Sequence, residues 1–152
     1  MTDPALTITD LVAGYGGVLA LRGVSLAVQP GTITAVLGAN GAGKTTLLTT
    51  ISGFVRPRQG RISLGGTDLT RRRPEEIARS GLAHVPEGQG VITELTVEEN
   101  LRLGALWRHG RASRAEALTD AYHRFPLLAA ARGRSAGTLS GGERQILSLI
   151  HI

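Results

Sequence analysis

The sequence of 152 residues predicts an α/β protein in which a β-rich first half is followed by a helical second half. Three observations lead to this fold class. Short apolar runs, alternating or β-branched, recur through the first 85 residues. A glycine-rich loop joins one of these runs to the start of a helix. From residue 96 onward the chain instead shows repeated helix-start patterns of the form Ser/Thr-x-x-Glu.

Strand character is clearest where apolar residues alternate with small or polar ones. Val24, Leu26 and Val28 fall on one face of such a segment. The predicted strands are residues 7–11, 24–28, 33–37, 61–64 and 82–85. Turn residues punctuate them, among them Pro30-Gly31 and Gly65-Gly66. A short helix is expected to start at Pro74 and to end at Gly81, because acidic residues follow the proline in the first turn.

The loop after residues 33–37 reads Gly-Ala-Asn-Gly-Ala-Gly-Lys-Thr-Thr and fits the pattern G-x-x-x-x-G-K-[ST]. Glycines let backbone N–H groups wrap closely around phosphate oxygens, and the helix that follows adds a partial positive charge. Lys44 is expected to reach the β- and γ-phosphates, and the Thr45 hydroxyl to ligate Mg²⁺. Lys44 is also the only lysine among 17 basic residues. The loop therefore predicts a nucleoside-triphosphate site.

The helical half begins with Thr96-Val97-Glu98-Glu99, which predicts a helix starting near Val97. A second pattern of this kind starts at Ser113 and predicts a helix that ends at Pro126. A third, at Ser140, places another helix start at Gly141.

Composition narrows the function classes. The chain has no cysteine, which excludes disulfides and thiolate metal sites, and it has no apolar run near 18 residues and no signal-peptide pattern. We therefore expect a soluble chain. The formal charge of +5 permits nucleic acid or an acidic membrane surface as partner, but the arginines are spread along the chain with one short cluster, Arg71-Arg72-Arg73. A GC-rich genome explains this make-up equally well.

Leu139-Ser140-Gly141-Gly142-Glu143, about a hundred residues after the phosphate loop, resembles the signature motif of ATP-binding-cassette (ABC) ATPases. The resemblance implies a P-loop NTPase fold of the ABC nucleotide-binding type, with a β-rich subdomain, a parallel-sheet core and a helical subdomain. Tyr15 then resembles the aromatic residue that stacks on adenine, although a turn residue packing on the strands is the alternative. The residues assigned to ATP binding are Tyr15, Gly38, Asn40, Gly41, Gly43, Lys44, Thr45 and Thr46. Ser140, Gly141, Gly142 and Glu143 are assigned to the ATP of a partner subunit.

Val85-Pro86-Glu87-Gly88, taken with the segment from Leu95 to Leu101, resembles the smaller ATPase subunit of branched-chain amino-acid importers. Glu87 stands where most ABC ATPases have a glutamine near Mg²⁺. The resemblance therefore makes Glu87 a catalytic candidate together with Lys44, and a metal-binding candidate together with Thr45. The chain departs from the group after this point, since Gln89, Gly90 and Ile92 replace its basic residues and phenylalanine.

The resemblance implies an ATP-binding subunit that uses ATP and Mg²⁺ to drive uptake of branched-chain or related amino acids. Its implied partners are a second ABC ATPase subunit in head-to-tail arrangement, membrane permease subunits and, indirectly, a solute-binding protein. The implied location is peripheral, on the cytoplasmic face of a bacterial-type cell membrane. Two alternatives stay open: the ATPase of another ABC importer, for urea, amides or other amino acids, and a soluble ABC ATPase acting on nucleic acid or ribosomes. Nucleic acid is not the favoured partner.

Three domains are expected: an ATP-binding core in residues 1–88, a helical subdomain in 89–146 and a non-native tail in 147–152. In the family, an Asp that holds Mg²⁺, a Glu that orients water and a switch histidine follow the signature, and no residues remain here to supply them. We therefore expect this chain to be C-terminally incomplete and to bind ATP without turnover. The tail Leu-Ser-Leu-Ile-His-Ile is what the end of a transposase sequencing adapter encodes in frame; the alternative is a natural C-terminus.

Overall fold

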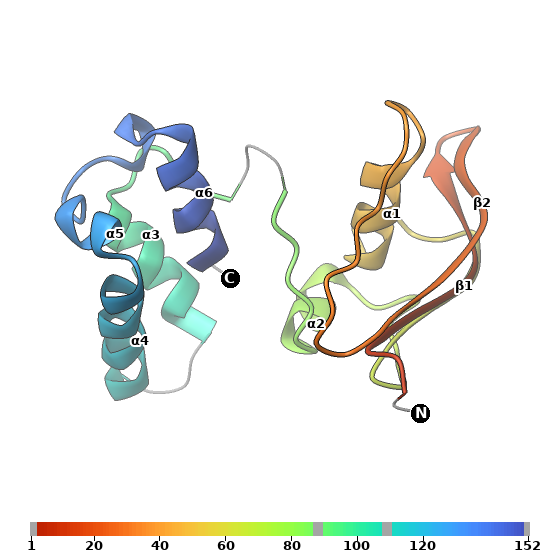
Figure 1. Ribbon diagram of the computed structural model, residues 1–152, viewed down its shortest axis with the longest axis horizontal. Coiled ribbons are helices and arrows are strands. Elements are labelled where there is room, and N and C mark those ends of the chain that lie inside the picture. The colour runs from red at the N-terminus through yellow and green to blue at the C-terminus, as the bar shows by residue number, and fades with distance from the viewer. Residues whose placement is uncertain (1–2, 87–89, 108–110, 151–152) are drawn as a thin grey trace. The chain divides into compact units, whose positions relative to one another are not determined.

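The computed structural model describes residues 3–86, 90–107 and 111–150. The chain divides into two compact units, Met1–His84 and Val85–Ile152 (Figure 1). Each unit has its own hydrophobic core. The first unit contains all the described strands, and the second contains helices, so the predicted change from a β-rich to a helical half is confirmed.

The first unit is built on a four-stranded antiparallel sheet with the order β2-β1-β3-β4. The strands are β1 (Leu6–Tyr15), β2 (Val18–Val28), β3 (Gln59–Leu64) and β4 (Thr67–Asp68). In the β1–β2 hairpin, Leu6 lies opposite Val28 and Tyr15 lies opposite Val18. The predicted strands at 7–11, 24–28 and 61–64 are therefore confirmed. The first two are longer than expected, because each continues to pair with the other up to the turn.

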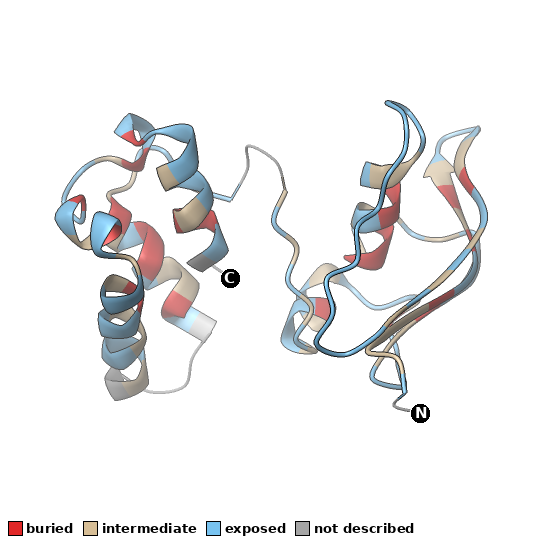
Figure 2. Ribbon diagram, in the orientation of Figure 1, coloured by how far each residue is buried: buried red, intermediate tan, exposed pale blue. Residues whose placement is uncertain are grey.

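Two helices complete the first unit, α1 (Lys44–Ile51) and α2 (Pro74–Arg79). The buried side of α1, which includes Leu47 and Ile51, joins the core formed by the sheet (Figure 2). The buried core residues are Ile8, Leu11, Ala13, Leu21, Leu47, Ile51, Ile62, Leu69 and Ile77. Burying a Leu or Ile side chain contributes about 1.5–3 kcal/mol. The core therefore fixes α1, and with it the loop that leads into the helix, against the strands.

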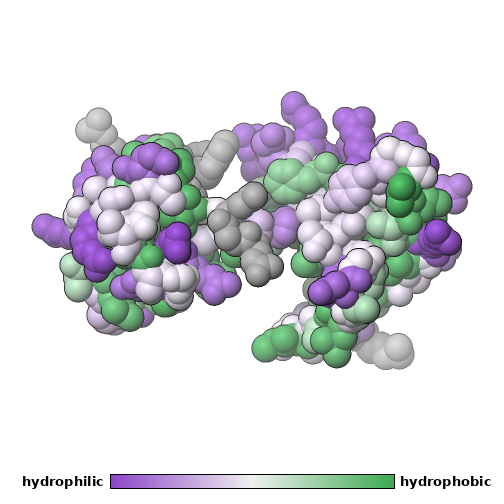
Figure 3. All heavy atoms as spheres, turned by 90° about the horizontal axis from the view of Figure 1, so that it is seen from above, coloured by the Kyte–Doolittle hydropathy of each residue, from purple (hydrophilic) through white to green (hydrophobic). Residues whose placement is uncertain are grey.

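Two predicted strands are wrong. Residues 33–37 and 82–85 have no strand assignment, and Ile33 and Leu37 are 102% and 88% exposed. A strand in water is stable only where neighbouring strands take up its backbone hydrogen bonds. The described strands pair with one another, all antiparallel, and none pairs with these two segments. The expected parallel-sheet core is accordingly not found among the described residues, and hydrophobic patches remain on the surface of the first unit (Figure 3).

The second unit contains four α-helices and two 3₁₀ turns within the residues described. They are α3 (Val97–Gly104), η1 (Ala105–Trp107), α4 (Arg111–Arg124), α5 (Pro126–Ala130), η2 (Ala136–Thr138) and α6 (Gly141–Ile150). The core they share consists of Val97, Leu101, Ala121, Leu128, Ala131, Ala136, Leu139 and Leu147. Helix α6 continues to Ile150 and so includes Leu147, which is fully buried although it was assigned to a non-native tail. That assignment stays a prediction.

The helix starts at Val97 and Gly141 are confirmed, each with its Glu in the expected cap. The start predicted from Ser113 is wrong, because α4 begins at Arg111 and includes Ser113. Serine is tolerated inside a helix, and the arginine and alanine that precede it are good helix formers. Within the described residues, no helix is both long enough and apolar enough to cross a membrane.

Candidate functional site

The loop of residues 38–43 approaches α1 through two glycines with left-handed backbone geometry. Gly41 has φ of 83° and Gly43 has φ of 89°, a region that L side chains rarely adopt. Residues 38–42 are exposed, and the Ala42 N–H donates to the Ala39 carbonyl at 3.1 Å. Gly38, Asn40 and Gly41 therefore lie on an open, tightly turned backbone, as the sequence predicted.

Gly43 is required for a second reason, since it packs against β2. A Cβ atom at this position would come 2.8 Å from the Ala20 carbonyl oxygen and 3.0 Å from Leu21 Cδ2. Both contacts are shorter than the ordinary van der Waals separation of about 3.5–4.0 Å between carbons. The hairpin thus sets how closely the loop and the first turn of α1 lie to the sheet.

The N-terminus of α1 is electrostatically open. Gly43 supplies no side-chain cap, and no acidic residue lies in the first turn. By contrast, α2, α3 and α6 each begin with a glutamate that accepts a backbone N–H of the cap. Because the first N–H groups of a helix carry about half a positive charge between them, α1 presents an uncompensated site for an anion.

Lys44 brings a full positive charge to the same place. Its Nζ donates to the carbonyl oxygens of Gly38 and Ala39, both at 2.8 Å. The ammonium therefore lies across the mouth of the loop, where a phosphate oxygen would compete with these carbonyls. The next residue, Thr45, is exposed at the start of the helix, whereas Thr46 is only 7% exposed. Thr45 is thus available to a ligand, and Thr46 offers mainly its backbone.

Tyr15 ends β1 at the hairpin turn and is 56% exposed. The turn lies at the same end of the first unit as the loop that enters α1 (Figure 1). The Tyr15 side chain is therefore exposed to solvent at the turn. Glu87, the candidate for Mg²⁺, lies outside the described residues. The part of the chain that the structure describes contains no group of three or more His, Asp or Glu side chains that would hold a metal.

The signature residues form the cap of α6 in the second unit. The Ser140 N–H donates to Glu143 Oε2 at 2.7 Å, and the Glu143 N–H donates to Ser140 Oγ at 3.3 Å. The Ser140 N–H, and after it the Ser140 hydroxyl, hold the pKa of Glu143 below its ordinary value of 4.5. Gly141 and Gly142 are exposed, and nothing lies within 4 Å of a Cβ built on either. Another chain can therefore approach their backbone.

Two features were missed by the reasoning from sequence. A hollow of about 320 Å³ lies beside the start of α6, lined by Pro86, Val91, Thr93, Gly141, Arg144, Gln145 and Ser148. In addition, Asn100 is fully buried in the second unit and bonds the segment before α3. The signal for Asn100 was a polar residue four positions after Thr96, on the helix face that also carries Val97 and Leu101.

The chain is similar in sequence to ATP-binding proteins of transporters. Residues 21–152 match the family described as ABC transporter. The chain is 40% identical over 146 residues to a probable branched-chain amino acid transport ATP-binding protein, LivF of Archaeoglobus fulgidus, covering 95% of the chain and 61% of LivF. It is 39% identical over 135 residues to the high-affinity branched-chain amino acid transport ATP-binding protein BraG of Pseudomonas aeruginosa, covering 89% and 58%. CysA of Mycolicibacterium paratuberculosis, a sulfate/thiosulfate import ATP-binding protein, is 35% identical.

Among solved structures, one titled as the ATP binding subunit of an ABC transporter superposes with a TM-score of 0.81 at 32% identity, covering 97% of this chain and 60% of the other. The chain thus spans about three fifths of the length of LivF and of BraG. The agreement in fold with that solved structure extends over 97% of this chain.

Proposed function

The chain belongs to the ABC transporter family, and from that premise we propose that it is the ATP-binding part of an importer for branched-chain amino acids. The observation that carries the proposal is the start of α1, where left-handed glycines, uncapped helix N–H groups and the Lys44 ammonium meet. Nothing else described in the first unit combines these features with an open backbone. They are what a triphosphate requires.

Each loop residue has a role in this proposal. The backbone of Gly38, Asn40, Gly41 and Gly43 surrounds the phosphates, and Lys44 exchanges its carbonyl partners for phosphate oxygens. The first N–H groups of α1, up to Thr46, add the positive end of the helix. Tyr15 stacks on the adenine. The protein thereby holds the triphosphate mainly through its backbone.

The donor set at the loop also suits Mg²⁺, which prefers oxygen ligands and keeps several waters. The exposed hydroxyl of Thr45 would supply one ligand, and Glu87 is proposed as a second contact in the same role. When bound, the ion neutralises charge on the β- and γ-phosphates. In this arrangement Lys44 contacts the phosphates directly, whereas Thr45 would act through the ion.

We propose further that Ser140, Gly141 and Gly142 bind the γ-phosphate of ATP held by a second ABC subunit, arranged head to tail. Their open backbone at the N-terminus of α6 suits an anion. Pairing would then depend on ATP, and hydrolysis in the whole protein would reverse it and drive a membrane permease from the cytoplasmic face. A solute-binding protein would deliver the amino acid on the other side.

The substrate class rests on the similarity to LivF and BraG, together with the Pro-Glu-Gly segment noted in the sequence. Similarity to CysA favours a different importer as the second candidate, because CysA matches over nearly the same part of the chain. An ABC ATPase acting on nucleic acid is a third possibility, permitted by the charge of +5. No described feature of the site favours it.

ATP binding by the 152-residue chain tests the core of the proposal. Lys44→Ala is expected to weaken Mg-ATP binding at least about tenfold, because it removes a charged hydrogen-bond donor to the phosphates. Arg71→Ala is the matched control, since it removes the same charge from the first unit at the hollow between β3 and α2. Isothermal titration calorimetry of both variants gives the comparison. Equal affinities for Lys44→Ala and Arg71→Ala would overturn the phosphate-loop assignment.

Hybrid transporters test the substrate class. Residues 1–146 of the chain replace the matching part of BraG in one hybrid and of CysA in another, each in a strain that lacks the native subunit. We expect leucine uptake to return with the BraG hybrid and sulfate uptake to stay absent with the CysA hybrid. The opposite pattern would assign the chain to a sulfate-type importer, and Lys44→Ala in each hybrid shows whether uptake depends on ATP.

A further inference from the structure

Asn100 is a fully buried polar side chain in α3, and its hydrogen bonds go to one short segment, residues 92–96. Its Oδ1 accepts the Ile92 N–H at 2.8 Å, and its Nδ2 donates to the carbonyls of Ile92 at 2.9 Å and Thr96 at 3.0 Å. A buried amide that loses its hydrogen-bond partners destabilises the folded state, because it cannot turn to water instead. Asn100 therefore fastens residues 92–96 to the helix that follows them.

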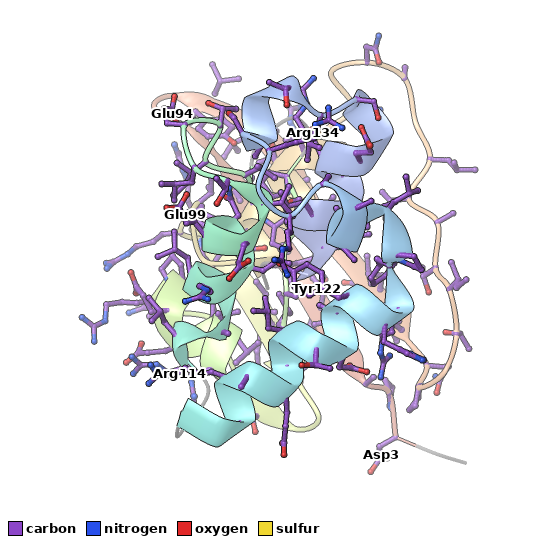
Figure 4. All side chains as sticks on the ribbon, turned by 90° about the vertical axis from the view of Figure 1, so that its left-hand side faces the viewer. Asp3, Glu94, Glu99, Arg114, Tyr122 and Arg134 are labelled. Carbon is purple, nitrogen blue, oxygen red and sulfur yellow. The ribbon has the colours of Figure 1, made fainter. Side chains whose placement is uncertain are left out.

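The segment fastened by Asn100 holds a second segment, residues 134–137. The Ser135 hydroxyl donates to the Thr93 carbonyl at 2.7 Å, and the Gly137 N–H donates to the same oxygen at 3.0 Å. The Ala136 N–H donates to the Leu95 carbonyl at 2.8 Å. Glu94 and Arg134, one from each segment, lie at the same end of the second unit (Figure 4). Two stretches some 40 residues apart are thus joined by short hydrogen bonds.

The second segment leads directly into the signature. The Thr138 N–H bonds to the Ser135 carbonyl at 3.0 Å, and the Leu139 N–H to the Ala136 carbonyl at 3.3 Å. Leu139 is only 4% exposed, and Ser140 follows it as the cap of α6. A Cβ atom built on Gly141 or Gly142 would meet nothing within 4 Å, so the place of their N–H groups depends on this anchored approach and on α6.

We propose that Asn100 is a positioning residue for the signature: through residues 92–96 and 134–137 it fixes where the Ser140–Gly142 backbone meets the γ-phosphate of the partner's ATP. This inference rests on the proposed function of the signature. A binding constellation loses strength when its groups move by about 0.5 Å. Asn100 touches no nucleotide and acts on pairing only through the hydrogen bonds just described.

The alternative is that Asn100 merely stabilises the second unit. Two variants and two matched controls separate these roles. Asn100→Ala removes the hydrogen bonds between α3 and residues 92–96. Ser135→Ala removes one hydrogen bond between residues 92–96 and 134–137, made by a partly exposed side chain. Leu128→Ala is a control that destabilises the core of the second unit without removing any of these hydrogen bonds. Thr119→Ala is a control that removes a comparable side-chain hydrogen bond, to the Ala115 carbonyl, on the exposed face of α4.

Amide hydrogen exchange on the 152-residue chain is the first measurement. In Asn100→Ala we expect the amides of Ile92, Ala136 and Gly137 to exchange at least tenfold faster than in Leu128→Ala, compared under conditions that give equal unfolding free energy. Amides of α1, in the other unit, should not change. Equal exchange in Asn100→Ala and Leu128→Ala would reduce Asn100 to a stabilising residue and overturn the proposal.

ATP-dependent pairing of the chain, followed by sedimentation velocity, is the second measurement, with Ser140→Ala as the reference. We expect Asn100→Ala to weaken pairing about as much as Ser140→Ala, Ser135→Ala to weaken it less, and both controls to match wild type, all with unchanged ATP affinity. If Ser140→Ala weakens pairing and Asn100→Ala does not, the positioning role of Asn100 is overturned, whereas the proposed function of the signature stands. If neither wild type nor Ser140→Ala forms pairs of chains when ATP is added, the proposed function of the signature is overturned. The hydrogen-exchange result then still decides whether Asn100 holds residues 92–96 and 134–137 together.

Discussion

Replacing Gly43 by alanine is the sharpest single test of how the fold builds the phosphate loop. Gly43 has φ of 89° and lies against β2, so the added methyl group meets two separate obstacles. Gly41→Ala is a natural comparison, because Gly41 has a similar φ of 83° but nothing within 4 Å of its Cβ position. The pair separates backbone strain from steric conflict.

The left-handed conformation costs an alanine about 1–2 kcal/mol, and this cost applies at both positions. At Gly43 the new Cβ also lies 2.8 Å from the Ala20 oxygen and 3.0 Å from Leu21 Cδ2. The oxygen belongs to a strand and cannot withdraw without disturbing the β1–β2 hairpin, so overpacking adds about 1–3 kcal/mol. We therefore expect a loss in unfolding free energy of about 2–5 kcal/mol for Gly43→Ala, against about 1–2 kcal/mol for Gly41→Ala.

Urea unfolding followed by circular dichroism gives both free energies, and calorimetry gives the Mg-ATP affinity of the folded Gly43→Ala protein. If the loop moves to relieve the conflict, affinity should fall at least about tenfold, which corresponds to about 1.4 kcal/mol. If Gly43→Ala does not fold while Gly41→Ala does, the loss of unfolding free energy caused by Gly43→Ala is about 5 kcal/mol or more. Equal stability of the two variants would refute the argument that the hairpin sets the position of the loop.

Three other predictions follow from the structure. Tyr15→Ala should weaken ATP and GTP binding alike by about twofold to tenfold, because stacking hardly distinguishes the bases; unchanged affinity in calorimetry would make Tyr15 a turn residue only. Leu147→Ala should cost about 2–5 kcal/mol of unfolding free energy, since Leu147 is fully buried, whereas Leu149→Ala, 58% exposed in wild type, should cost less than about 0.5 kcal/mol; equal losses would show that Leu147 does not pack in the core. Because folding lowers the pKa of Glu143, its cap on α6 contributes stability that is complete above about pH 4.5 and is lost as the pH falls through the lowered pKa; exchange of the Ser140 amide should rise over that range relative to its intrinsic rate, and the same rise in Glu143→Gln would contradict the assignment.

Local chemistry explains why much of the candidate site was predictable from sequence. Glycines at positions 41 and 43 suit a turn with positive φ, and Ser140 with Glu143 forms a helix cap completed within four residues. Such features depend on neighbours in the chain. The structure accordingly has the same turn and the same cap.

Residues 33–37 show the limit of local reasoning. Their β-branched, apolar composition favours a strand, but strand formation depends on partners elsewhere in the chain, and none of the described strands pairs with them. Ser113 shows the same limit for helices, because the pattern of a cap lies inside α4, which begins at Arg111. Pairing and helix length are decided by contacts that a short pattern does not contain.

The sequence by itself determined the chemistry at the two ends of the proposed ATP contact: the glycines, Lys44 and Thr45 of the loop, and the Ser-Gly-Gly cap of α6. Only the tertiary structure decided that β2 requires a glycine at position 43, that Lys44 lies across the loop's mouth, and that Asn100 anchors the approach to Ser140. The physical reason is that charge and backbone freedom are properties of residues in order along the chain. Close packing and buried hydrogen bonds are properties of residues that only the fold brings together.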